Sequence, residues 1–152
     1  MESKYNNKII TWSKVATVFF LILMAAADVI GVSSARYLCV TWTGRTDTLA
    51  LAIFTIVYYA ITVMAFILLI SVFKLLSNMS RDLVFDRKNT RLMTAIVLAL
   101  VFTGFFFVLL AFVWGEAAFL ALTAWFMALI VLSVKVVFDK AIVMKNDLDL
   151  TI

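Results

Sequence analysis

Four long apolar runs, separated by short polar segments, constrain this chain more than any other feature of its sequence. They cover residues 15–38, 49–73, 92–113 and 117–138. Each run is long enough to cross the ~30 Å hydrocarbon layer as a helix, because a spanning helix needs about 20 apolar residues. The segments between the runs are too short to hold a soluble domain. The sequence therefore predicts an all-α, polytopic integral membrane protein in which four transmembrane helices form one bundle.

The composition agrees with a single membrane domain over residues 1–152. Apolar residues make up 66% of the chain, whereas a typical soluble domain has about 45–50%. The chain has no His and a single cysteine, Cys39, which argues against a His–Cys metal site and excludes an internal disulfide. Because a catalytic base needs a placed nucleophile or metal beside it, we expect no enzymatic activity and no cofactor.

The distribution of lysine and arginine predicts the orientation of the helices. Eleven of the thirteen basic residues fall in the N-terminal segment, the 74–91 loop or the C-terminal end, and only Arg36 and Arg45 fall on the opposite side. Since cytoplasmic loops are rich in Lys and Arg, we expect both termini and the 74–91 loop to face the cytoplasmic side of a plasma membrane. The net charge of +4 then fits contact with anionic membrane lipid, and no feature of the sequence predicts nucleic-acid binding.

Small residues recur every four positions on the first predicted helix, at Ala27, Gly31 and Ala35. Such a stripe lets two helix backbones approach closely inside a membrane. Two interpretations stay open, which are packing within the bundle and a homodimer formed through the same three residues. The very short linker at 114–116 predicts that the third and fourth helices are antiparallel neighbours.

Asp28 lies near the middle of the first predicted helix, inside the membrane. A charge at that depth costs roughly 2.5–3.5 kcal/mol, so an intramembrane carboxylate is a candidate functional group. Counting from the helix boundaries places Tyr58, Tyr59 and Thr103 at a similar depth, and Arg36 about two turns further out. These five residues form a candidate polar site. We interpret it either as a proton-coupled or cation-binding site, or as a buried acid that holds the helices together.

The 74–91 loop provides a second candidate site. Asp86 is predicted to cap the third helix with Asn89 in its first turn, although a cap at Asn89 is also compatible with the sequence. Phe85 precedes the cap and is expected to pack on an apolar residue of the first turns. The loop has a structural interpretation and an interaction interpretation. For the latter, the residues expected to contact a partner protein or lipid headgroups are Arg81, Phe85, Asp86, Arg87, Lys88, Asn89 and Arg91.

The start of the third helix also carries a resemblance to a known family. The pattern is a Phe followed four residues later by Asn, then a basic residue and Leu, here Phe85, Asn89, Arg91 and Leu92. It resembles the bacterial membrane family catalogued as domain of unknown function 2975, as do the helix count and the length. The chain departs from that pattern at Val84 and Met93. Members often accompany a small helix-turn-helix regulator, so the resemblance implies a regulatory setting and no particular activity.

Three classes of function stay open. The first is a non-enzymatic integral membrane protein that acts through interaction, as a regulator, an accessory subunit or a self-protection factor. The second is a small proton-coupled exporter or channel-like oligomer in which Asp28 is the coupling acid. The third is a membrane enzyme acting on lipid, which only Asp28 and a tyrosine would support. The absence of a catalytic constellation and the charged loop favour the first class.

Overall fold

The computed structural model describes residues 2–81, 83–84 and 86–150, with the side chains of 2–7 and 149–150 left out. Within this part of the chain there are helices and no strands. The five helices are α1 (Glu2–Val29), α2 (Gly31–Thr43), α3 (Thr48–Met79), α4 (Arg87–Ala111) and α5 (Ala117–Leu150). All except α2 are long and apolar enough to cross a membrane. The all-α class and the four candidate spans are confirmed.

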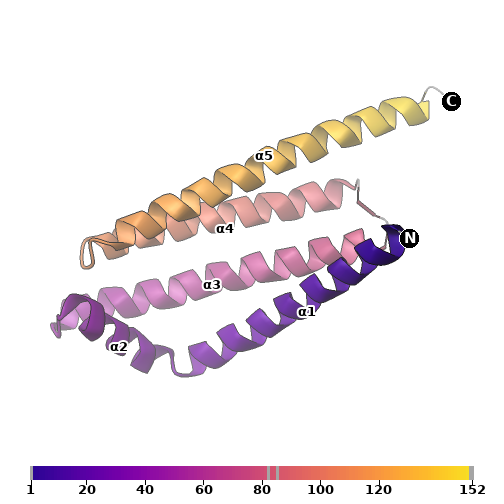
Figure 1. Ribbon diagram of the computed structural model, residues 1–152. Helices are drawn as coiled ribbons and strands as arrows, with labels where there is room; N and C mark the ends of the chain where they lie inside the picture. Colours follow the sequence, from indigo (N-terminus) through magenta and orange to yellow (C-terminus); the bar gives the residue numbers. More distant parts are fainter. Residues whose placement is uncertain (1, 82, 85, 151–152) are drawn as a thin grey trace.

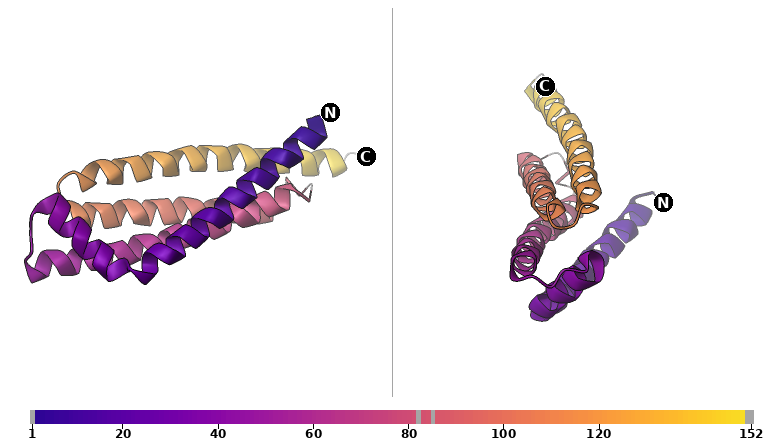
Figure 2. Two further views of the ribbon diagram at one scale, coloured as in Figure 1. Left: turned by 60° about the horizontal axis from the view of Figure 1, so that its bottom comes forward. Right: turned by 90° about the vertical axis from the view of Figure 1, so that its left-hand side faces the viewer.

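The long helices lie side by side in an open arc rather than in a closed bundle (Figure 1). The end-on view of Figure 2 shows α1 and α2 at one edge of the arc and α5 at the other. Among the described helices, α5 contacts α4 alone, and α1 contacts only α2 and α3. The long helices thus contact one another in the order α1, α3, α4 and α5, and one hydrophobic cluster still joins Cys39 of α2, Leu110 of α4 and Ala117 of α5.

The first predicted span, 15–38, is wrong as a single helix because the chain breaks at Ile30. α1 ends before this residue, and α2 turns away from it at a sharp angle (Figure 2). A Cβ at Gly31 would lie 2.6 Å from the hydroxyl oxygen of Tyr59, so glycine is what lets the start of α2 approach α3 so closely. Asp28 consequently lies in the last turn of α1 rather than near the middle of a continuous helix.

The helices of the other three spans extend beyond their apolar runs. α3 continues to Met79, α4 begins at Arg87 and α5 continues to Leu150. An apolar run marks only the segment that crosses the membrane, whereas a helix continues through polar residues until a cap or turn ends it. The loop between α3 and α4 is therefore 80–86, much shorter than the predicted 74–91.

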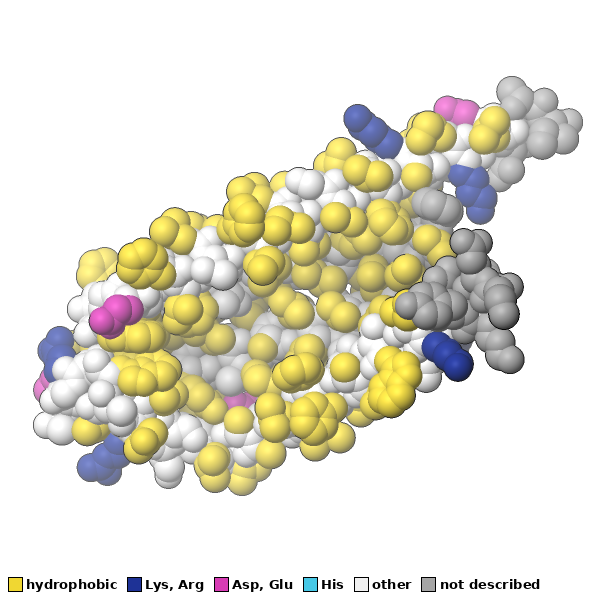
Figure 3. All heavy atoms as spheres, in the orientation of Figure 1, with side chains coloured by type: hydrophobic (Ala, Val, Ile, Leu, Met, Phe, Trp, Pro, Cys, Tyr) yellow, Lys and Arg dark blue, Asp and Glu magenta, His cyan; other side chains and the backbone are white. Residues whose placement is uncertain are grey.

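The N-terminus, the C-terminus and the 80–86 loop lie at one end of the molecule (Figure 1). A hydrogen bond of 2.6 Å from Lys14 Nζ to Ser80 Oγ joins α1 to this loop. On the face shown in Figure 3, hydrophobic side chains cover the length of the helices, and Lys and Arg side chains lie toward the two ends. This distribution suits helices whose middle parts face lipid.

α4 and α5 make the most extensive helix contact, which confirms that they are antiparallel neighbours. Trp125 of α5 lies against Gly104 of α4, and its indole N–H donates to the carbonyl of Val101 at 3.2 Å. At the opposite end from the termini, the ring of Trp42 stacks on that of Trp114 with centroids 4.5 Å apart. The small residues of α5 that are buried at this contact or beside it are Ala117, Ala121, Ala124 and Ala128.

Replacing Gly104 by Ala is expected to destabilise the protein by about 1–3 kcal/mol, because the added Cβ would overlap the indole of Trp125. Thermal unfolding in detergent micelles measures the effect. Gly115→Ala is the matched control, since a Cβ at that exposed position meets nothing within 4 Å. Equal stability of Gly104→Ala and the control would contradict the close packing of Trp125 on α4.

Candidate functional site

The break between α1 and α2 lies beside the first half of α3. It faces Tyr58 and Tyr59, both of which contact Gly31. Tyr58 is ten residues beyond Thr48, the first residue of α3, which places it about 15 Å along the helix axis. Half of a ~30 Å hydrocarbon layer is about 15 Å. On this count along α3, we expect the polar groups at the break to lie about half-way across the layer.

Tyr58 interacts with the backbone at this break. Its hydroxyl donates a hydrogen bond of 3.2 Å to the carbonyl of Ala27. The carbonyl of Ile30 accepts a bond of 2.9 Å from the N–H of Ser34, within the first turn of α2. The rings of Tyr58 and Tyr59 meet edge to face, with centroids 5.5 Å apart. Two of the backbone carbonyls at the break, those of Ala27 and Ile30, are thus partnered.

The Oδ1 atom of Asp28 is buried and has no hydrogen-bond partner within the described part of the chain. Tyr58 lies within electrostatic range of this carboxyl group. Arg36 is exposed on α2 and makes no bond to the buried oxygen. Thr103 donates to the carbonyl of Ala99 in its own helix at 2.8 Å, and α1 does not contact α4 among the described helices.

The five residues of the predicted polar site are therefore only partly brought together. The structure groups Asp28, Tyr58 and Tyr59 around the break, and it leaves Arg36 and Thr103 apart from them. Sequence counting could not separate these two sets, because depth along a helix says nothing about which helices are neighbours. Arg36 belongs to α2, which does not continue the axis of α1 (Figure 2). Its predicted position, two turns further along one continuous helix, was therefore wrong.

Two cavities meet at Tyr58. One has a volume of about 270 Å³ and an almost entirely apolar lining that includes Met24, Trp42 and Phe54. The other has a volume of about 460 Å³, and hydroxyl groups of Ser33, Ser34, Tyr37 and Tyr58 are among its lining side chains. Hydroxyl oxygens, aromatic rings and a nearby carboxylate are groups that attract a proton or a cation. They offer no positive charge to an anion.

The small-residue stripe of the first predicted helix is used within the molecule. Gly31 and Ala35 are buried, and Gly31 packs against the two tyrosines of α3. Ala27, on the other side of the break, accepts the hydrogen bond from Tyr58. Packing within one chain thus accounts for the stripe, and a homodimer through the same residues stays a prediction.

At the end of the molecule where the termini lie, the side chain of Asn89 organises the 80–86 loop. Asn89 is only 1% exposed. Its Nδ2 donates to the carbonyl oxygens of Leu83 at 2.6 Å and Val84 at 2.8 Å. Its Oδ1 accepts from Nδ2 of Asn78 at 2.7 Å. One buried amide therefore ties the end of α3, the loop and the start of α4 together.

Asp86 caps α4, as the sequence predicts. Its carboxylate accepts a hydrogen bond of 2.8 Å from the backbone N–H of Lys88. The alternative cap at Asn89 is wrong, because Asn89 is already inside the helix and its side chain bonds to the loop. Phe85 lies outside the described residues, so its expected packing on the first turns of α4 stays a prediction.

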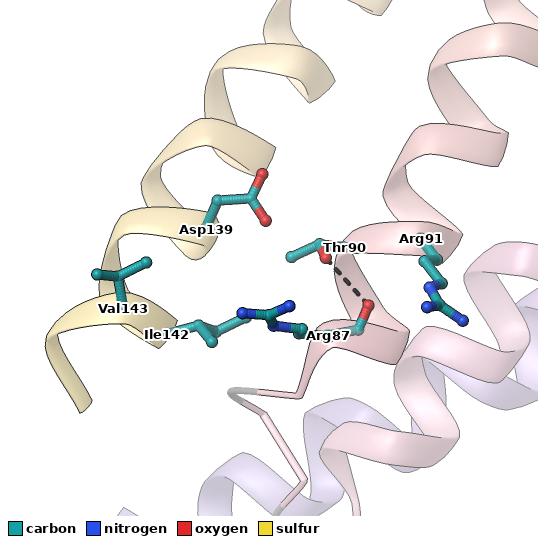
Figure 4. Close-up of a pocket in the computed structure, with 6 residues that line it drawn as sticks. All are labelled: Arg87, Thr90, Arg91, Asp139, Ile142 and Val143. Atoms are coloured by element: carbon teal, nitrogen blue, oxygen red, sulfur yellow. Dashed lines mark hydrogen bonds between the residues drawn. The ribbon is translucent and has the colours of Figure 1, made fainter. Parts of the chain in front are cut away.

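The basic residues of this end separate into two groups, although Arg81, Arg87, Lys88 and Arg91 are all exposed. Arg87 and Arg91 line a cavity of about 300 Å³ between α4 and α5, together with Thr90, Asp139, Ile142 and Val143 (Figure 4). Arg81 and Lys88 do not line it. The sequence did not predict that residues of α5 line this cavity. The one indication in the sequence was the spacing of four between Lys135 and Asp139, which is typical of an ion pair within a helix. They form an ion pair of 2.8 Å.

Comparison with known proteins adds one finding. Residues 32–152, most of the chain, match the family described as protein of unknown function DUF2975. No curated protein and no solved structure matches the chain. The matched segment contains Asn89 and the 80–86 loop, whereas Asp28 lies before its first residue.

Replacing Asn89 by Ala is expected to destabilise the protein by about 2–3 kcal/mol, because carbonyls of the loop lose a buried donor. Tryptic cleavage after Arg81 should become faster, since the loop is no longer held. Limited proteolysis followed by mass spectrometry, together with thermal unfolding, measures both effects. Asn146→Ala, an exposed position of α5, is the control. Cleavage at the rate of the unmodified protein would contradict the role of Asn89.

Proposed function

The chain belongs to the DUF2975 family, and we propose that it is a non-enzymatic membrane protein that acts through interaction. Its role is regulatory, accessory or self-protective, and the loop between α3 and α4 is the surface that a partner protein recognises. The protein lies in a bacterial plasma membrane with both termini in the cytoplasm. The grouping of both termini with the loop (Figure 1) supports a common side for all three, and the excess of Lys and Arg at that end supports the cytoplasmic side.

The observation that best supports this proposal is the buried amide of Asn89. A connection of seven residues between two helices needs no buried polar anchor simply to join them. Here three hydrogen bonds of one side chain hold the loop in a single shape. A loop that is already ordered loses less conformational entropy when it binds, so the anchor favours recognition of a partner.

The basic side chains on either side of the α4 cap indicate the kind of partner: Arg81 lies in the loop and Lys88 in the first turn of α4, while the carboxylate of Asp86 is used in the cap. Arg81 and Lys88 are exposed and do not line the cavity between α4 and α5. Opposite charges across an interface accelerate association and select among partners. An acidic surface on a cytoplasmic protein is therefore the expected counterpart.

A photo-crosslinking amino acid in place of Lys88 is expected to capture one cytoplasmic protein in living cells. Arg81→Glu in the same chain should lower the yield of this adduct at least about fivefold, because it puts a negative charge opposite an acidic partner. The same crosslinker in place of Glu116, at the other end of the molecule, serves as the control. Equal adducts from both positions, or an adduct unchanged by Arg81→Glu, would contradict the proposal.

A second candidate function is favoured by Asp28, whose buried Oδ1 lacks a hydrogen bond beside a helix break. Broken helices at the membrane centre are a feature of ion-coupled transporters, in which carbonyls at helix ends and carboxylates hold the coupling ion. In this alternative the protein is a small proton-coupled exporter or a channel-like oligomer. Asp28 exchanges a proton against an apolar cation held by the aromatic side chains of the adjoining cavity.

Proteoliposomes with an imposed pH gradient test this alternative. A proton-coupled exporter should accumulate a lipophilic cation such as tetraphenylphosphonium, and Asp28→Asn should reduce the uptake to that of protein-free vesicles. Asp28→Asn preserves the size of the side chain. Glu116→Gln, the same kind of change at an exposed position, is the control, and the two variants are compared at equal amounts of protein per vesicle. No uptake by the unmodified protein, or equal uptake by Asp28→Asn, would exclude Asp28 as a coupling acid.

A further inference from the structure

The cavity between α4 and α5 combines charged and apolar walls. The side chains of Arg87 and Thr90 point from the first turns of α4 toward α5, and Asp139 of α5 points back toward them (Figure 4). Arg91 lies one turn further along α4, and its guanidinium lies to the other side of that helix in this view. Ile142 forms a buried apolar wall, at 5% exposure.

Two independent counts place this cavity in the headgroup region. About 20 residues cross the hydrocarbon layer, and counting back from Ala111, the last residue of α4, leaves Arg87 and Arg91 outside it. Counting forward from Ala117, the first residue of α5, leaves Asp139 and Ile142 outside it as well. The cavity therefore opens at the depth where phospholipid phosphates lie.

The charge of the lining favours an anion. Asp139 forms an ion pair of 2.8 Å with Lys135, and it also interacts electrostatically with Arg87 across the cavity. Three cations, Lys135, Arg87 and Arg91, are therefore set against this one carboxylate, so the cavity and its rim keep an excess of positive charge. Arginine binds phosphate through two parallel hydrogen bonds, which gives both strength and orientation.

The apolar part of the cavity continues into a neighbouring hollow. That hollow has a volume of about 390 Å³, and Asp139 and Val143 line both spaces. Met144 adds further apolar surface, and Lys140 lies at its edge. A ligand with a phosphate and an attached apolar chain would contact both the charged cavity and the apolar hollow beside it, whereas a free anion would contact only the first.

We propose that this cavity is a binding site for the phosphate group of an anionic glycerophospholipid. Arg87 is the principal phosphate contact, Arg91 turns to bind the same headgroup, and Ile142, Val143 and Met144 contact the start of an acyl chain. The site does not depend on the proposed recognition of a protein by Arg81 and Lys88. A lipid held here clamps the start of α4 to the far part of α5.

Binding of phosphatidylglycerol to the purified full-length protein in detergent tests the site, with native mass spectrometry as the readout. We expect the protein to retain phosphatidylglycerol in preference to phosphatidylcholine. Arg87→Gln should weaken binding at least about tenfold, because a hydrogen-bonded charge contact is lost. Arg81→Gln removes the same charge outside the cavity and should change binding less than about twofold.

Further outcomes separate the possible sources of the phosphate. If glycerol 3-phosphate or inorganic phosphate at millimolar concentration displaces phosphatidylglycerol, the ligand is a soluble anion and the assignment of a lipid is overturned. Equal losses in Arg87→Gln and Arg81→Gln would overturn the cavity in favour of diffuse surface charge. Asp139→Asn should leave phosphatidylglycerol binding intact or strengthen it, and a loss comparable to that of Arg87→Gln would contradict the proposed geometry. Unfolding temperatures measured without lipid identify any variant that has failed to fold.

Discussion

Inside the hydrocarbon layer, a backbone carbonyl or N–H without a hydrogen bond costs several kcal/mol, and the fold follows from that cost. The long helices avoid this cost because their backbone N–H and carbonyl groups form hydrogen bonds with each other. Even side-chain hydroxyls within them bond to carbonyls one turn earlier, as Thr55 does at 2.8 Å and Ser133 at 2.9 Å. Where α1 gives way to α2, the hydroxyl of Tyr58 supplies the missing donor. Asp28 Oδ1, left without such a partner, is the departure from this pattern among the described side chains.

Lipid replaces the contacts that an open arc lacks. Large apolar side chains are widely exposed on these helices, including Phe112 at 81% and Phe119 at 72%. In water such a surface would promote aggregation, whereas a bilayer solvates it. Helix contacts then depend on close fit, because there is no hydrophobic driving force between helices in lipid. The Gly104–Trp125 and Gly31–Tyr59 contacts supply that fit, each with a glycine on one helix and a large ring on the other.

Features that depend on neighbours in sequence were predictable, and those that depend on neighbours in space were not. Hydropathy and length predicted the four spans, and the cap at Asp86 followed because its bond to Lys88 is local. The break at Ile30 was hidden within a continuous apolar run. It depends on Tyr59, which belongs to another helix. The burial of Asn89 likewise depends on a partner at the end of the preceding helix, and the α4–α5 cavity depends on how those two helices align.

The position of α1 and α2 at one edge of the arc has an energetic consequence. Among the described helices they contact only each other and α3, and α5 is held only by α4. A molecule pulled from its N-terminus would therefore lose the contacts of α1 and α2 with α3 and the Trp42–Trp114 stack, while the packing of α3, α4 and α5 persists as a separate cooperative unit. The Asp28 region and the α4–α5 cavity share no lining residue, so we expect ligands at the two proposed sites to bind independently of each other.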